Sequence, residues 1–229
     1  VLALLSSAGC AHHGSAAEAR AEHPAGGERP TVDSVTVAMW SMDETGGAHA
    51  IDSGPHAFGG TSGLETRTDY GRFGRARVFT RSLDSFVFVP MAPELEPYGG
   101  FTIEAWINLN SFGDYEDTPI AARWVAQNSQ RSWLFTVVGR RLKWPAVPAS
   151  GPGDHASLVA GHATGLLLFA FQPADAGEAR AYASTRPIEL GRWTHVAATD
   201  DGLTVRLWIN GMLDAQYASP GRIRHSEAP

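Results

Sequence analysis

The sequence predicts an all-β protein, and three observations support this. In segment 203–209, apolar residues alternate with polar or amphipathic ones, which is the period of a half-buried strand. The dipeptides Asp201-Gly202 and Asn210-Gly211 flank this segment, and both favour tight hairpin turns. The 229 residues include 25 glycines and only 18% charged residues, which suits short strands joined by turns. No segment keeps a helical period beyond a turn or two, so we expect antiparallel strands.

The same reading places strands along most of the chain. The clearest one covers 101–109, where Phe101, Ile103 and Ala105 alternate with polar residues and Trp106. The other expected strands cover 35–42, 77–79, 85–89, 123–125, 133–138, 165–172 and 180–185. Residues 145–165 are rich in Pro, Gly, Ala and His, and this stretch is longer than most loops, so we interpret it as an insertion.

Several short motifs occur in an order that resembles a known family. They are an opening strand at 37–44, the segment I-D-S-G at 51–54, which is similar to a D-x-S-G loop, G-x-x-G-x-A at 71–76, F-T-I-E-x-W at 101–106, W-x-H-V-A at 193–197 and L-W-I-N-G at 207–211. Together they resemble the LamG-like jellyroll domains of the concanavalin A-like lectin/glucanase superfamily. The resemblance implies an antiparallel β-sandwich over 35–229. It also implies closing strands with I-G-x and G-x-I-D-E motifs, which we expect this fragment to lack.

The N-terminal residues predict export. Residues 1–5 are apolar, and small residues precede Cys10, the only cysteine. We interpret 1–10 as the remnant of a bacterial lipoprotein signal peptide, with lipidation at Cys10; the alternative is a free thiol in a disordered tail. Residues 11–34 contain almost no large apolar side chains and are expected to form a disordered tether. The expected location is the bacterial cell envelope, through this lipid anchor, or outside the cell.

The charge pattern excludes one class of partner. The net charge is −6, and lysine and arginine do not cluster anywhere. Binding to nucleic acid needs a basic patch that neutralises phosphates, so we expect no nucleic-acid partner. No apolar run is long enough to span a bilayer, so contact with a membrane is expected only through the lipid anchor.

The superfamily contains glycoside hydrolases, so catalysis has to be considered. The resemblance implies that such an enzyme would carry two carboxylates on one strand in an E-x-D-x-x-E pattern, and this pattern is absent. Glu104 has no carboxylate two residues away, and Asp114, Glu116 and Asp117 fall in an expected solvated loop. We therefore expect no enzyme activity.

The resemblance also implies a structural calcium ion near an early loop. Asp52 is the best candidate ligand, with Asp43 as a second, since calcium prefers oxygen ligands. The alternative is that Asp52 caps a turn of its own backbone.

Tryptophans are the candidate ligand-binding residues. Trp40, Trp106, Trp193 and Trp208 match family positions on expected strands, which favours core packing, and His195 is likewise expected to be structural. Trp106 and Trp208 share strand faces with polar residues, which leaves sugar stacking as an alternative. Trp124, Trp133 and Trp144 flank the insertion. For each of the three, packing beneath the insertion is the favoured interpretation, and a contact with a sugar or a protein partner is the alternative.

These observations lead to one main functional hypothesis. The chain is expected to be a non-catalytic recognition module at the cell surface that binds a glycan or a surface protein. Two alternatives remain: a purely structural or adhesive domain of a surface protein, and a diverged glycoside hydrolase.

Overall fold

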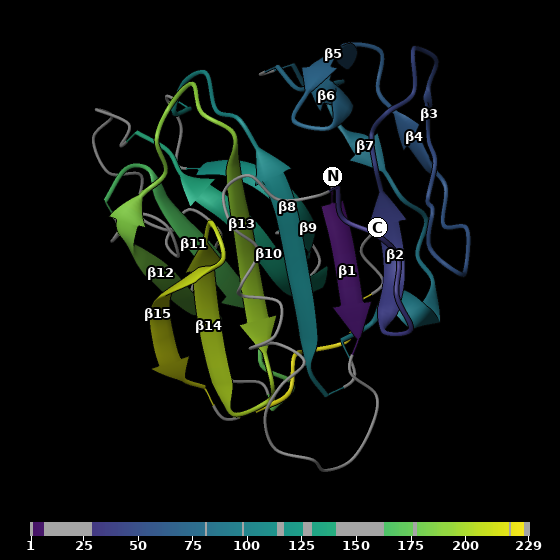
Figure 1. The fold of residues 1–229 in the computed structure, drawn as a ribbon. Coiled ribbons are helices and arrows are strands. Elements are labelled where there is room, and N and C mark those ends of the chain that lie inside the picture. Colours follow the sequence, from purple (N-terminus) through teal and green to yellow (C-terminus); the bar gives the residue numbers. More distant parts are fainter. Residues whose placement is uncertain are drawn as a thin grey trace.

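The computed structural model describes residues 2–6, 29–80, 82–97, 99–113, 117–125, 130–140, 163–175, 178–219 and 221–226. Two antiparallel sheets stack face to face, and smaller sheets lie beside them (Figure 1). Within the described residues, no helix has the length and hydrophobicity needed to cross a bilayer. The prediction of an antiparallel β-sandwich is confirmed.

The first sheet has six strands in the order β15-β14-β13-β8-β1-β2. These are β1 (Leu2–Ser6), β2 (Thr36–Trp40), β8 (Phe101–Ile107), β13 (Thr194–Asp200), β14 (Thr204–Ile209) and β15 (Met212–Ala218). The Asn210-Gly211 turn connects β14 to β15, and both residues have positive φ angles of 53° and 76°. This is the backbone shape that the Asn-Gly pair predicts.

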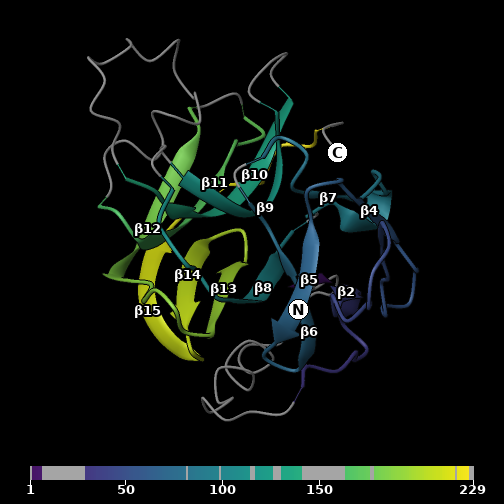
Figure 2. The ribbon, with the colours of Figure 1, turned by 90° about the horizontal axis from the view of Figure 1, so that it is seen from above.

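The second sheet has four strands in the order β12-β11-β10-β9 and lies behind the first (Figures 1 and 2). Its strands are β9 (Asp117–Val125), β10 (Gln130–Val138), β11 (Leu166–Phe171) and β12 (Arg180–Pro187). Strands β10 and β11 are buried on both faces, because Leu134, Val138, Leu168 and Ala170 form a second apolar cluster on the side away from the main core.

The main core fills the space between the two sheets. Side chains that alternate along the strands of both sheets meet there, as expected for a sandwich. The largest fully buried ones are Phe135, Phe169, Phe171, Ile103, Leu167 and Leu207. Val196, Leu207 and Ile209 belong to this core as predicted. Trp193 does not, because it lies just before β13 and stays half-exposed.

A smaller region precedes the sandwich strands. It contains β3 (His49–Ala50), β4 (Gly60–Ser62), β5 (Arg67–Gly71), β6 (Gly74–Val78) and β7 (Val87–Phe88), followed by the short 3-10 helix η1 (Pro93–Leu95). β3, β4 and β7 form one sheet, and β5 and β6 form a hairpin. The region has its own small core of Ala38, Trp40 and Ala50, to which Leu95 adds a contact shared with the main core.

The two expected N-terminal segments are described only in part. Leu2–Ser6 forms β1, between β2 and β8. Cys10 and residues 11–28 lie outside the described residues. Of the expected tether, residues 29–34 are described, and Arg29 there forms an ion pair with Asp43. Most of the expected insertion, together with Trp144 just before it, also lies outside the described part of the chain.

Candidate ligand-binding face

The outer face of the six-stranded sheet carries most of the candidate binding residues. Along β8, Phe101, Ile103 and Ala105 point into the core, so Glu104 and Trp106 point outward and are half-exposed. The register of the sheet places Trp106 opposite His195 of β13. It places Glu104 opposite Ala197, which in turn is opposite Trp208 of β14. Trp106, His195, Glu104 and Trp208 therefore share one face, and we call them the outer-face cluster.

Direct contacts join three members of the cluster. The rings of Trp106 and His195 lie 5.4 Å apart between centroids. His195 Nε2 lies 3.3 Å from Glu104 Oε2, and these two side chains are 17% and 19% exposed. Solvent can therefore reach a carboxylate, an imidazole and an indole that lie next to one another.

The β5–β6 hairpin packs on one end of this cluster. Its turn brings Phe73 edge-on against Trp106, with centroids 5.5 Å apart, and the Arg72 guanidinium lies 5.1 Å from the Trp106 ring centre. Gly74, with φ at +97°, shapes the turn, and an added Cβ there would contact Asp43. Trp106 is therefore a half-buried anchor for the hairpin as well as a surface aromatic.

Trp208 lies on the opposite side of the cluster, away from the hairpin. Its indole Nε1 donates a long hydrogen bond of 3.4 Å to Thr199 Oγ1. Neighbouring Arg206 donates to Gln216 Oε1 over 3.2 Å and pairs with Asp201 over 2.9 Å. Polar groups thus border the indole. In ligand-binding sites of this kind, the ring of the ligand stacks on the aromatic side chain and neighbouring polar groups orient the ligand by hydrogen bonds.

The cluster lacks the second carboxylate that glycoside hydrolysis uses. The same-face neighbours of Glu104 along its strand are Thr102 and Trp106, and its partners across the sheet are Ala3 and Ala197. A retaining hydrolase needs a second carboxylate about 5 Å away. None of these four residues supplies it.

The two candidate calcium ligands already accept hydrogen bonds from protein groups. Asp52 Oδ1 accepts from the backbone N–H groups of Met39 and Gly54, both over 2.7 Å, and Oδ2 accepts from that of Phe58 over 2.8 Å. This is the turn-capping role that the sequence left as the alternative. Gly54 has no space for a side chain, since an added Cβ would lie 2.8 Å from Asp52 Oδ1.

Asp43 is occupied in a similar way. Its Oδ1 accepts the Arg75 N–H over 2.7 Å, and the Arg29 guanidinium pairs with Oδ2. The Arg75 hydrogen bond is the main reason that the pKa of Asp43 lies below its ordinary value. These hydrogen bonds use part of the accepting capacity of each carboxylate, and the described residues contain no group of three His, Cys, Asp or Glu side chains suited to a metal. Calcium binding stays a prediction.

The other candidate tryptophans lie away from the outer-face cluster. Trp124 is half-buried on β9, packs against the second apolar cluster, and has the Arg131 guanidinium 5.9 Å from its ring centre. Trp133 belongs to the main core. The structure thus brings Trp106 and Trp208 onto one face and places Trp124 on the other sheet.

Two polar sites were not found by sequence reasoning. Glu96 and Arg123 form a buried ion pair of 2.8 Å, with side chains 2% and 6% exposed, and Arg123 also donates to the carbonyl of Ser226. Asp117, expected in a solvated loop, instead begins β9 and accepts a hydrogen bond from Thr136 Oγ1. Nothing in the sequence around Glu96, Arg123 or Asp117 signals the buried ion pair or the hydrogen bond at the start of β9.

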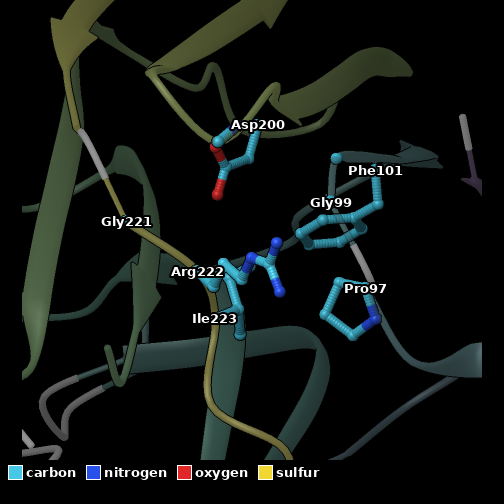
Figure 3. A pocket seen from close by; sticks show the side chains of 9 residues that line it. Pro97, Gly99, Phe101, Asp200, Gly221, Arg222 and Ile223 are labelled. Atoms are coloured by element: carbon cyan, nitrogen blue, oxygen red, sulfur yellow. The ribbon is translucent and has the colours of Figure 1, made fainter. Parts of the chain in front are cut away.

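A small pocket lies where the β13–β14 turn approaches Pro97, residues 99–101 and residues 221–223 (Figure 3). Asp200 lines it, and burial raises the pKa of this carboxyl to about 6, although the Gly202 N–H donates to it over 2.8 Å. Apart from Asp200 and Arg222, glycine, proline and apolar residues line the pocket. It therefore offers few groups for recognising a ligand.

Comparison with known proteins identifies the family. The family model described as concanavalin A-like lectin/glucanases superfamily matches residues 82–229. The chain belongs to this superfamily. No curated protein sequence matches it.

Solved structures share the fold at low sequence identity. The binding domain of Paraclostridial Mosquitocidal Protein 1 has a TM-score of 0.57 and 12% identity, with 82% of this chain and 42% of that one covered. The botulinum neurotoxin serotype G binding domain has a TM-score of 0.52 and 14% identity, covering 77% and 39%. This chain therefore spans about two fifths of either.

A third structure matches over most of both chains. It is domain 4 of AbnA, a GH43 extracellular arabinanase from Geobacillus stearothermophilus, in complex with arabinotriose. The TM-score is 0.52 and the identity 19%, with 84% of this chain and 80% of that one covered. At these identities the three likenesses establish the fold.

Proposed function

We propose that this domain is a non-catalytic recognition module that binds carbohydrate on the outer face of its six-stranded sheet. The observation that carries the proposal is the outer-face cluster, in which Trp106 and Trp208 flank Glu104 and His195. Indole rings stack on the apolar faces of sugars, and carboxylate and imidazole groups bind hydroxyls. The arabinotriose bound by the AbnA domain makes a short arabinan a reasonable first probe.

The absence of a second carboxylate beside Glu104 favours binding over hydrolysis. The imidazole of His195 contacts Glu104 and packs against the ring of Trp106. A structural or adhesive role remains the alternative, and it predicts no affinity for small sugars. A protein ligand on the same face would also need Trp208, so the choice of probe separates these hypotheses.

The direct test is a glycan array on the complete chain, followed by calorimetric titration with arabinotriose and with each glycan that binds. Trp208→Ala should weaken binding about tenfold, because stacking of a nucleic-acid base on one aromatic ring is worth about 1–3 kcal/mol, and we expect a sugar ring stacked on the indole to contribute similarly. Glu104→Gln should weaken it less, since the amide still forms hydrogen bonds.

A matched control is Phe88→Ala, which removes an exposed aromatic side chain from β7, a strand of a different sheet from the one that carries the cluster. It should leave the affinity unchanged. An array without any bound glycan, or equal loss of affinity in both variants, would refute the proposal and favour the structural role.

We also propose that the full-length protein is exported and anchored through a lipid on Cys10. The support is the sequence pattern of an apolar run, small residues and a lone cysteine. Expressed in a bacterial host, the full-length protein should enter the detergent phase, and Cys10→Ser should move it to the aqueous phase. Identical partition of the two forms would reject lipidation.

A further inference from the structure

The two indole rings of the outer-face cluster have different surroundings. Phe73 packs edge-on against Trp106 at 5.5 Å, and the Arg72 guanidinium lies 5.1 Å from the centre of the same ring. The His195 ring packs against Trp106 at 5.4 Å. Within the described residues, no aromatic ring or guanidinium packs on Trp208, which is half-exposed on β14. Trp208 therefore has a ring face for stacking, whereas Trp106 is enclosed by its neighbours and forms part of a wall.

A row of paired residues connects Trp208 to Glu104 across the sheet. Glu104 of β8 lies opposite Ala197 of β13, which lies opposite Trp208 of β14. Leu213 of β15, which is 48% exposed, continues the row. The neighbours of Ala197 along β13 belong to the main core, so its methyl group faces outward. This methyl group alone lies between the indole and the carboxylate, whose backbones are about 10 Å apart, or two strand spacings.

The β5–β6 hairpin limits the cluster on the β8 side. Its tip, Arg72 and Phe73, packs on Trp106, which is two residues along β8 from Glu104 and therefore on the same face. The Asp43 carboxylate accepts a backbone N–H from the hairpin over 2.7 Å and thereby fixes the tip. Figure 1 shows the hairpin beside β8 and far from β14 and β15. A glycan on this face can therefore extend over β14 and β15, but the hairpin blocks its way past Trp106.

Given the carbohydrate binding proposed above, on which this inference rests, we propose that the outer-face cluster recognises the end of a glycan chain. The terminal ring stacks on Trp208, and the hairpin tip acts as an end-stop. A terminal ring carries a hydroxyl where an internal ring has a glycosidic oxygen. The hydroxyl can donate to the Glu104 carboxylate, whereas a glycosidic oxygen only accepts and would face another acceptor. The rest of the chain leaves the site over β15.

One polysaccharide can separate chain ends from chain interiors. Linear arabinan is cut to increasing extents with an endo-acting arabinanase, and its binding to the complete chain is measured by calorimetric titration at constant mass of sugar. The number of binding sites should rise in proportion to the number of chain ends. Across pure arabino-oligosaccharides of three to six units, the stoichiometry should stay at one and the Kd should change less than threefold, because added units extend away from the cluster. If the array selects another glycan, its oligomers replace arabinan.

Substitutions at the hairpin and at Glu104 test the two sources of selectivity. Arg72→Ala combined with Phe73→Ala removes the end-stop, and Glu104→Gln supplies an amide N–H that can donate to a glycosidic oxygen. Each change should reduce the preference for cut over intact arabinan at least threefold. The matched control is Tyr70→Ala, which removes an aromatic side chain of the same hairpin that is 86% exposed. It should keep the wild-type preference, and melting curves check that each variant is folded.

Several outcomes would overturn the proposal. If the number of sites followed the total sugar and not the chain ends, while Trp208→Ala still abolished binding, carbohydrate binding would stand and chain-end recognition alone would be rejected. Absence of binding to arabinan and to every glycan of the array would reject both. A folded Arg72→Ala, Phe73→Ala chain that keeps the full preference for cut arabinan would also count against the end-stop. If that variant does not fold, the cutting series and Glu104→Gln decide.

Discussion

The smaller region of β3–β7 packs around residues of β2, and we call the whole the β2–β7 region. It and the two-sheet sandwich are stabilised by different interactions. Between the sheets, large side chains such as Phe135, Phe169 and Phe171 are fully buried. In the β2–β7 region the apolar core is small, and buried polar groups organise the loops. Asp52 binds three backbone N–H groups there. Arg77, with a side chain 2% exposed, pairs with Glu44 over 3.2 Å and donates to the carbonyls of Gly47 and His49.

This difference indicates which substitutions each region tolerates. A sandwich core loses stability in proportion to the apolar volume removed, and neighbouring side chains can partly relax. A loop organised by one carboxylate loses several hydrogen bonds at once, and its N–H groups stay buried without partners. Four substitutions, taken from the largest expected effect to the smallest, test this contrast.

The largest effect is expected in the sandwich. Phe169→Ala empties the centre of the main core, where Phe169 contacts the rings of Phe101 and Phe171. We expect a loss of about 3–5 kcal/mol in the free energy of unfolding, measured by urea denaturation. Phe88→Ala, at the exposed surface of the β2–β7 region, should cost less than about 1 kcal/mol. Equal losses would contradict the assignment of the main core.

The second effect tests the polar organisation of the smaller region. Asp52→Ala removes three hydrogen bonds from backbone N–H groups to a buried carboxylate. We expect a loss of about 2–4 kcal/mol, because hydrogen bonds to charged groups are worth more than neutral ones. If Asp52 acts only as a turn cap, the loss should be the same in millimolar calcium and in chelator. A wild-type Tm that rises with calcium, in contrast to an unresponsive Asp52→Ala variant, would instead support Asp52 as a calcium ligand.

The sandwich and the β2–β7 region also differ in how well the sequence predicts their strands. Strands β8 and β14 were predicted closely, because each buries one face, and this gives a period of two that is visible in the sequence. β3 and β4, of two and three residues, are too short to show any period. The carbonyl of His49 in β3 accepts a hydrogen bond from Arg77, a residue 28 positions away, so this part of the structure depends on a contact that no local pattern encodes.

The candidate site was predicted in a similar, partial way. The alternation on β8 and β14 showed that Trp106 and Trp208 face away from the core. It could not show that both lie on the same sheet face with His195 between their strands, since this depends on the pairing register. The contact of Arg72 and Phe73 with Trp106 depends on where a distant hairpin packs, and no local pattern encodes that.

The third effect is a gain in stability with a defined pH dependence. Burial raises the pKa of Asp200 to about 6 in the folded state, above the ordinary value of 3.8. The folded protein thus binds this proton more tightly than the unfolded chain, so the contribution of Asp200 to stability falls as the pH rises from about 4 to 6, and its full cost persists above pH 6. Asp200→Asn resembles the protonated form and should stabilise by up to about 3 kcal/mol at pH 7. Near pH 3.5 it should have no effect.

The adjacent Asp201 provides the matched control for this prediction. Burial opposes its ionisation, but hydrogen bonds from Arg206 and from the backbone of Leu203 and Thr204 outweigh it, so the pKa of Asp201 lies below its ordinary value. Asp201→Asn should therefore destabilise the protein at neutral pH, opposite in sign to Asp200→Asn, and this destabilisation should decrease only below about pH 3.8, where the folded protein begins to protonate Asp201. Melting curves across pH 3.5–8 compare the two, and shifts of the same sign would contradict the buried state of Asp200.

The smallest effect compares two arginines that serve the same region. Arg29 pairs with Asp43 at the surface, with side chains 47% and 29% exposed, whereas Arg77 is buried with Glu44. An exposed ion pair contributes at most about 1 kcal/mol and is screened by salt, while removal of one partner of a buried pair costs about 3–5 kcal/mol. Arg29→Ala should therefore cost less than about 1 kcal/mol, and the cost should shrink in 1 M salt, since Asp43 keeps its hydrogen bond from the Arg75 N–H. Arg77→Ala should cost several times more and respond little to salt.

If Arg29→Ala proved as damaging as Arg77→Ala, the segment 29–34 would belong to the fold of the β2–β7 region, and the tether would have to end before Arg29.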